Sequence, residues 1–177
     1  DEVRSIKSTN DDLRNAQEFF IVIDKEGLKK SDLVEAKEHF DKMADYYLNL
    51  EFTPRTIVGD DPSALSDSLY GNNDVMGGDP SHGTHVAGII GAVRNNDLGM
   101  DGIATNVKLM TIRAVPDGDE RDKDIALGIR YAVNNGAEVI NMSFGKYYSP
   151  HSQMVFDAIV YAERNGVIMV HAAGNDA

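Results

Sequence analysis

Two histidines, His82 and His85, lie three residues apart in the segment Ser81–Ile90, which reads SHGTHVAGII. Histidine can act as a general base near neutral pH, because its unperturbed pKa is about 6.5. Gly83 lets the backbone approach closely where a helix is expected to begin. This segment is the strongest candidate for chemistry in the chain.

The same histidines allow two other interpretations. His85 can be a structural residue whose ring is satisfied inside the fold. His82 and His85 also share one face of a helix, as metal ligands can, but the carboxylate of a HExxH metalloprotease motif is missing between them. Zinc ligation is therefore disfavoured.

The HGTHVAGII stretch resembles the histidine motif of subtilisin-like serine proteases, the subtilases. The resemblance implies that His82 is the general base and that His85 is a structural neighbour. A serine hydroxyl is a poor nucleophile until a positioned base removes its proton, which is the work this role requires.

Two later segments resemble the same family in the same order, namely 141–145 (NMSFG) and 170–175 (VHAAGN). By this resemblance the first lines the substrate groove, and the Asn175 side chain donates a hydrogen bond to the oxyanion. Each segment alone is a weak signal, but the three motifs together are specific. The substrate-binding residues that the resemblance implies are Gly118, Ser143, Phe144, Gly145, Ala172 and Gly174.

Residues 94–102 (RNNDLGMDG) resemble a calcium-binding loop of some subtilases. Asn96 is the best candidate ligand and Asp97 could assist it, because calcium takes oxygen ligands. A plain polar turn is the alternative. The chemistry itself requires no cofactor, so calcium would be structural.

Helices and strands are expected to alternate after residue 82. The expected helices cover 83–94, 123–134 and 151–165, and the expected strands cover 107–114, 138–142 and 167–172. This order predicts an α/β fold, a parallel sheet with helices on both faces. Ligands bind beyond the carboxyl ends of such strands. The resemblance covers residues 79–175 and implies an incomplete subtilisin-like domain.

The chain is expected to divide near residue 54. Residues 1–53 are predicted to form a helical hairpin (helices 11–26 and 32–49) that is an insertion, and 54–177 a partial catalytic domain. The run 19–23 (FFIVI) could instead be a buried strand. Residues 54–81 are rich in turn residues and are expected to be loops.

Neither the aspartate nor the serine of a subtilase triad is visible. Asp24 follows an apolar run, but Lys25-Glu26-Gly27 replaces the expected small residue and glycine. No serine has a Gly-Thr-Ser-Met-Ala context. We therefore expect an interior fragment that is inert alone. In the family the aspartate strand lies between the strands expected at 107–114 and 138–142, so strand exchange, dimerisation or a complementing fragment is expected.

Composition excludes several classes. The 177 residues carry 17 Lys plus Arg against 29 Asp plus Glu, a net charge of −12, which disfavours nucleic acid as a partner. There is no cysteine, hence no disulfide or thiol nucleophile. No apolar run reaches the roughly 18 residues of a membrane span, and no export signal opens the chain.

Two functions remain in competition. The first is a fragment of a serine endopeptidase whose substrate is an extended peptide or protein, extracellular, periplasmic or at the cell surface by family resemblance. The second is a non-catalytic, pseudoprotease-like module that binds extended peptide by strand addition. Asp-Thr-Gly upstream and Gly-Thr-Ser downstream in the parent gene would favour the enzyme. A nucleotide-binding domain is disfavoured, because no Gly-x-Gly-x-x-Gly or Walker segment is present.

Overall fold

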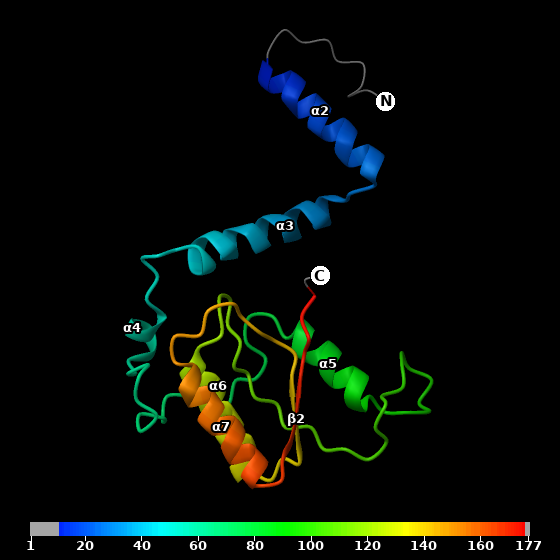
Figure 1. Ribbon diagram of the computed structural model, residues 1–177. Helices are drawn as coiled ribbons and strands as arrows, with labels where there is room; N and C mark the ends of the chain where they lie inside the picture. The colour runs from blue at the N-terminus through cyan, green and yellow to red at the C-terminus, as the bar shows by residue number, and fades with distance from the viewer. Residues whose placement is uncertain (1–10, 176–177) are drawn as a thin grey trace. The chain divides into compact units, whose positions relative to one another are not determined.

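The computed structural model describes residues 11–175, and the chain divides into two units after Asn49 (Figure 1). The described part of the first unit, from Asp11 onward, holds α2 (Asp11–Glu26), α3 (Lys30–Lys42) and the short π-helix η1 (Met43–Tyr47). The second unit holds α4 (Pro54–Val58), α5 (Ser81–Gly91), α6 (Asp122–Asn134), β1 (Val139–Met142), α7 (Ser152–Arg164) and β2 (Ile168–His171).

The first unit is helical where the sequence predicted helices. Gly27 follows α2 with φ +70°, and the Leu28 amide donates to the Ile23 carbonyl at 3.0 Å, which is a glycine-terminated helix end. The alternative strand at residues 19–23 is therefore wrong, and Asp24 lies within a helix. No residue of α3 or η1 is buried. Among residues 11–175, no helix is both long and apolar enough to cross a lipid bilayer.

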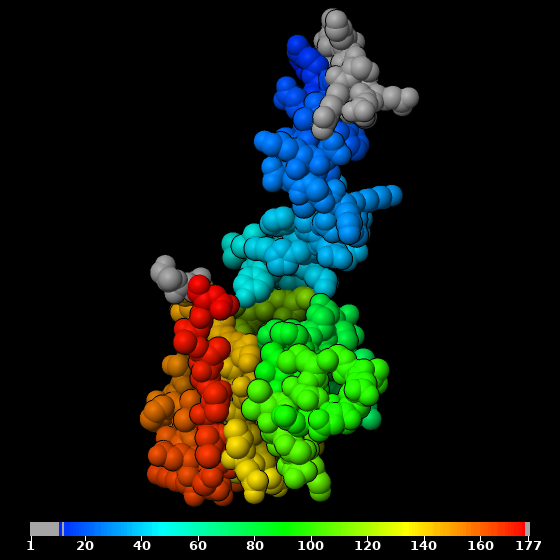
Figure 2. Space-filling view, turned by 90° about the vertical axis from the view of Figure 1, so that its right-hand side faces the viewer, coloured from blue at the N-terminus to red at the C-terminus, as the bar shows by residue number. Residues whose placement is uncertain are grey.

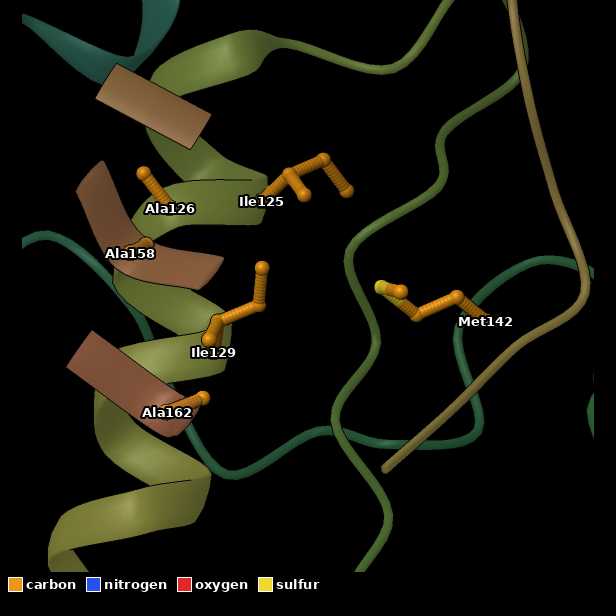
Figure 3. Close-up of a cluster of buried hydrophobic side chains, with 6 residues drawn as sticks. All are labelled: Ile125, Ala126, Ile129, Met142, Ala158 and Ala162. Atoms are coloured by element: carbon orange, nitrogen blue, oxygen red, sulfur yellow. The ribbon is translucent and has the colours of Figure 1, made fainter. Parts of the chain in front are cut away.

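The core of the second unit lies where α6 packs against α7. Ala126, Ala158 and Ala162 are completely buried, because their small side chains let the two helix backbones approach each other. Ile125, Ile129 and Met142 complete the cluster, with Met142 reaching it from β1 (Figure 3). The helix pair therefore fixes the sheet from one side.

The sheet has two parallel strands. β1 pairs with β2 from Val139 opposite Ile168 to Met142 opposite His171, and α7 connects them. This confirms an α/β arrangement and two of the three predicted strands, those at 138–142 and 167–172. The C-terminal residues, coloured red, form a ridge on the face shown in Figure 2, and Ile168 and Val170 of β2 are exposed.

The third predicted strand, 107–114, is wrong, because these residues form irregular backbone. A strand needs a hydrogen-bonded neighbour, and no described residue pairs with this segment as a strand. Its side chains pack instead against helices: Val107 lies over Gly91 of α5, and Ile112 lies over Gly128 of α6. Leu109 is left half exposed.

A buried ionic cluster fastens residues 55–70 to the start of α6. Lys123 donates to an Asp60 carboxylate oxygen at 2.7 Å and to the Asp61 carbonyl at 2.6 Å. Arg55 bridges Asp60 and Asp124, at 2.9 Å from each. Arg55 belongs to α4, so the prediction that 54–81 are all loop is wrong at this helix, which begins at a proline.

Charge pairing makes the burial of this cluster tolerable. The side chains of Lys123 and Asp60 are each 1% exposed, and the Lys123 ammonium also lies 4.8 Å from the centre of the Tyr70 ring. Burial alone would raise the pKa of Asp60, but hydrogen bonds from Lys123 and Arg55 outweigh it and lower that pKa. Burial and a hydrogen bond to Asp124 raise the pKa of Tyr70. The cluster is therefore held in its ionised form.

Replacing the buried ammonium should destabilise the second unit strongly. Lys123→Met leaves Asp60 buried with Arg55 as its only cation, and we expect the free energy of unfolding to fall by about 3 kcal/mol. Arg113→Met is the matched control, because its 3.4 Å pair with Asp74 is largely exposed and should contribute at most about 1 kcal/mol. Urea denaturation followed by circular dichroism measures both. Equal effects of the two substitutions would contradict the importance of the cluster.

Candidate functional site

Two of the predicted groove segments meet at the carboxyl end of the sheet. Residues 143–145 follow β1 and residues 172–175 follow β2. The Ala172 amide donates to the Met142 carbonyl at 3.1 Å, so pairing continues to the point where both strands end. Because the strands are parallel and adjacent, these segments must leave the sheet side by side.

Phe144 anchors the first of these segments. Its half-buried side chain packs against the core cluster, and its ring meets the His171 ring edge-on with centroids 6.4 Å apart. Ser143 is also held locally, because its hydroxyl accepts a hydrogen bond from the Asn141 side-chain amide at 2.8 Å. Residues 143–144 are thus held by the packing of Phe144 against the core and by the hydrogen bond between Asn141 and Ser143.

A second wall approaches through Gly118 and Glu120. Gly118 has φ +119°, a conformation that favours glycine, and it turns the chain toward the start of α6. A Glu120 carboxylate oxygen accepts a hydrogen bond from the Gly145 amide at 3.1 Å, although these residues lie 25 positions apart. Glu120 is 5% exposed. The direct contact with the predicted groove is therefore made by Glu120, two positions after Gly118.

Hydrogen bonds and an ion pair between Lys146 and Asp122 hold the chain after Gly145 in place. Lys146 donates to the Glu120 carbonyl at 2.7 Å and pairs with Asp122 at 2.7 Å. Asp122 also accepts hydrogen bonds from the Ser149 hydroxyl and the His151 amide, at 2.6 and 2.7 Å. Burial would raise the pKa of Asp122, but these donors, Lys146 first, lower it. The carboxylate thus holds residues 146–151 against the first turn of α6.

The predicted base and oxyanion donor stand apart from these contacts. His82 is exposed as the second residue of α5, His85 is exposed on the same helix, and Asn175 is exposed as the last described residue. Within residues 11–175, no hydrogen bond or ion pair joins His82 or Asn175 to Ser143–Gly145. The helix itself is tied to residues 102–104, through bonds such as Gly102 amide to Ala92 carbonyl at 3.1 Å.

The loop 94–102 forms a hydrogen-bonded turn. Asn95 and Asp97 both have positive φ, at 56° and 57°. The Asn96 side-chain oxygen accepts the Leu98 amide at 3.1 Å, and an Asp101 oxygen accepts the Asn95 amide at 3.0 Å. Calcium needs six to eight oxygens, and residues 11–175 contain no group of three or more His, Asp or Glu side chains placed to hold a metal. Calcium binding through Asn96, Asp97 and main-chain oxygens stays a prediction.

The sequence analysis missed the charged residues that shape this site, namely Glu120, Asp122, Lys123 and Lys146. Three of them lie in the run 117–124 (DGDERDKD), which is typical of a solvated loop, and Lys146 lies directly after the segment 141–145. The only local signal is that the run directly precedes an amphipathic helix. Burial of such residues depends on which distant chain covers them, so composition alone does not reveal it.

Comparison with known proteins gives consistent similarities. The family model described as the subtilase family matches residues 38–177. The chain is 43% identical over 97 residues to the thermophilic serine proteinase of Bacillus sp. (strain AK1), covering 54% of this chain and 24% of that protein. It is 38% identical over 99 residues to the minor extracellular protease Epr of Bacillus subtilis (strain 168), covering 55% of this chain and 15% of that protein.

A third relative aligns over more of the chain. Subtilisin-like protease 1 of Plasmodium berghei (strain Anka) is 33% identical over 144 residues, which cover 77% of this chain and 24% of that protein. The chain therefore spans no more than about a quarter of these curated relatives.

Gly145 is a glycine that the fold itself does not require. A Cβ at Gly145 would meet only the His171 ring, at 3.9 Å, so Gly145→Ala should change the free energy of unfolding by less than about 1 kcal/mol. Gly102→Ala is the control, because a Cβ there would lie 2.3 Å from the Ala92 amide nitrogen and should cost about 3 kcal/mol. Thermal and urea unfolding compare the two. A large loss for Gly145→Ala would assign that glycine to folding rather than to ligand approach.

Proposed function

This chain belongs to the subtilase family, and from that membership we propose that the whole protein is a serine endopeptidase that hydrolyses peptide bonds through an acyl-enzyme. The observation that carries the proposal is the family match over residues 38–177, which includes all three predicted motifs. The groove segment 143–145, positioned at the end of β1, supports an extended peptide as the substrate.

In the proposed mechanism, His82 takes the proton of a serine hydroxyl as that oxygen attacks the substrate carbonyl. The same histidine then gives the proton to the leaving amine, and water repeats the sequence to release the acyl group. The Asn175 side-chain amide donates to the oxyanion of the tetrahedral intermediate. The groove residues Ser143–Gly145 and Ala172 pair with and flank the peptide.

We propose that residues 1–177 alone are inert, since no serine in a nucleophile context and no orienting aspartate is visible. Fluorophosphonate labelling read by intact mass should give no adduct on this chain and a single adduct on the full-length protein. In that protein, His82→Ala should lower kcat/KM by about 10⁴-fold or more, and His85→Ala far less. An adduct on this chain, with Ser143 the first residue to check, would overturn the account.

A peptide-binding module without catalysis is the second candidate. Its support is that the groove contacts lie entirely within this chain, including the 3.1 Å Glu120–Gly145 hydrogen bond. Strand addition to such an edge needs backbone groups and no nucleophile. A full-length protein that binds peptide but takes no fluorophosphonate adduct would favour this module over the enzyme.

We further propose that a strand from a second copy or a complementing fragment completes the sheet. β1 uses the carbonyls of Glu138 and Met142 toward β2, so the backbone groups of Val139 and Asn141 point to its other edge, where no described residue pairs with them. Apolar side chains of the irregular segment 107–114 are exposed as well, among them Leu109 and Met110. Both features support an incomplete sheet.

Light scattering of the purified chain tests this completion. We expect a dimer, with a mass twice 19.4 kDa, and Val139→Pro should shift it toward monomer because it removes one edge donor. Val93→Pro, at an exposed residue outside the sheet, serves as the control. A wild-type monomer that also gains no mass when the aspartate-strand peptide of the full-length protein is added would contradict the proposal.

Structural calcium at Asn96 and Asp97 remains a proposal whose ligand shell the described loop does not complete. Calcium that binds only the folded state stabilises that state, and so raises the melting temperature as the calcium concentration exceeds its Kd. If these residues bind it, millimolar calcium should raise the Tm above that in EGTA by a few degrees, and Asn96→Ala should abolish the difference. An unchanged Tm in the full-length protein would leave residues 94–102 as a plain turn.

An extracellular, periplasmic or cell-surface location is proposed for the whole protein. Its support is the names of two relatives, the minor extracellular protease Epr and the cell wall-associated protease of Bacillus subtilis (strain 168). The absence of cysteine is compatible with any of these compartments.

A further inference from the structure

The Gly145 amide, which the proposed function assigns to pairing with substrate, is already occupied. Its single hydrogen is donated to a Glu120 carboxylate oxygen at 3.1 Å. A peptide carbonyl that pairs with Gly145 must therefore replace Glu120 at this donor. Substrate binding and the Glu120 contact exclude each other.

Among residues 11–175, no cation pairs with the carboxylate of Glu120. The residue is 5% exposed, and the described residues give it no ion pair. The nearest ammonium, that of Lys146, contacts the main-chain carbonyl of Glu120 and is paired with Asp122. A desolvated carboxylate whose hydrogen bond comes from an uncharged amide gains from a cation that reaches it, because opposite charges attract more strongly where water is excluded.

We infer that Glu120 is a specificity-determining residue that selects extended peptides carrying a lysine or arginine side chain, through the juxtaposition of its carboxylate with the Gly145 amide. The inference rests on the proposed function of residues 143–145 as a peptide-binding edge. A neutral peptide displaces Glu120 from Gly145 without compensation. A cationic side chain pairs with the displaced carboxylate, so a full ion pair replaces the hydrogen bond between that carboxylate and the uncharged Gly145 amide.

Glu120 lies close enough to the predicted groove for its carboxylate to reach a bound peptide without movement of the backbone. It lies beside Gly118, on the wall that faces Ser143–Gly145, and its backbone is fixed by Lys146 at 2.7 Å. The Glu120 carboxylate can therefore leave the Gly145 amide by rotation of the Glu120 side chain alone, and the ion pair between Lys146 and Asp122 stays intact. The carboxylate remains next to the peptide after it leaves the amide.

The test is the affinity of matched peptides for the full 177-residue chain. Acetylated, amidated pentapeptides of alanine carry either lysine or norleucine at one position, moved through the sequence, and isothermal titration measures each Kd. ¹⁵N spectra of the Gly145 amide show whether a peptide binds at this edge. For the best position we expect lysine to bind about tenfold more tightly than norleucine, the gain of one charge-assisted hydrogen bond.

Two variants distinguish the effect of the Glu120 charge from the effect of its hydrogen bond with the Gly145 amide. Glu120→Gln keeps the shape and an acceptor for Gly145 but removes the charge, so the lysine-to-norleucine ratio should fall to about one. Glu120→Ala frees the amide, so the norleucine peptide should bind more tightly than it does to the wild type. Asp117→Asn, which removes a charge from the same loop, controls for general attraction of cations to a chain of net charge −12 and should keep the ratio.

The outcomes distinguish the inference from its premise. An equal lysine-to-norleucine ratio in the wild type and Glu120→Gln, with Gly145 shifts present, overturns the role of Glu120 and leaves the groove standing. Peptides that bind neither the wild type nor Glu120→Ala, with no Gly145 shift, overturn the peptide-binding edge and the inference together. If Asp117→Asn lowers the lysine-to-norleucine ratio as much as Glu120→Gln does, the preference comes from net charge, and the role of Glu120 is also overturned.

Discussion

The first turn of α6 is the constraint on which the rest of the second unit depends. Its buried Lys123 pairs with Asp60 and so holds residues 55–70, while Asp122, one position earlier, holds Lys146 and residues 149–151. Successive residues of a helix point about 100° apart, so neighbours of opposite charge bind chain segments on different sides. The remaining face of the helix packs against α7 through alanines. One turn therefore joins three parts of the unit that are distant in sequence.

The structure separates what a sequence can predict from what it cannot. The helix that ends at Gly27 and the strands at 139–142 and 168–171 follow from local signals, a glycine after a periodic run and short apolar runs between helices. The strand expected at 107–114 does not form, because a strand is defined by a neighbour and not by its own composition. Lys123 is the opposite failure: its charge predicts exposure, and a partner 63 residues away buries it.

The same distinction applies to the candidate site. The alternation of helices and strands predicted that the segments after β1 and β2 would leave one edge of a parallel sheet, and they do, whereas the strand expected at 107–114 does not form. The motifs placed His82 and Asn175 by resemblance alone, and the described contacts leave both side chains in solvent, apart from the groove. The contact between Glu120 and Gly145 could not be predicted, because nothing in the run DGDERDKD shows which carboxylates turn inward. Burial of that residue is a property of the assembled unit.

Binding and chemistry are supported by different parts of this chain. The groove segment 143–145 is held by the core at Phe144, by Glu120 at Gly145 and by the Lys146–Asp122 pair just after it, and all of these contacts lie between residues 120 and 171. None of them requires a nucleophile or an orienting acid. Under the proposed function, these contacts would hold the peptide-binding segment in place whether or not the triad is assembled, and preorganisation of this kind lowers the cost of ordering when peptide binds. Recognition of a peptide would then be a property of this unit, and cleavage would depend on segments that complete it.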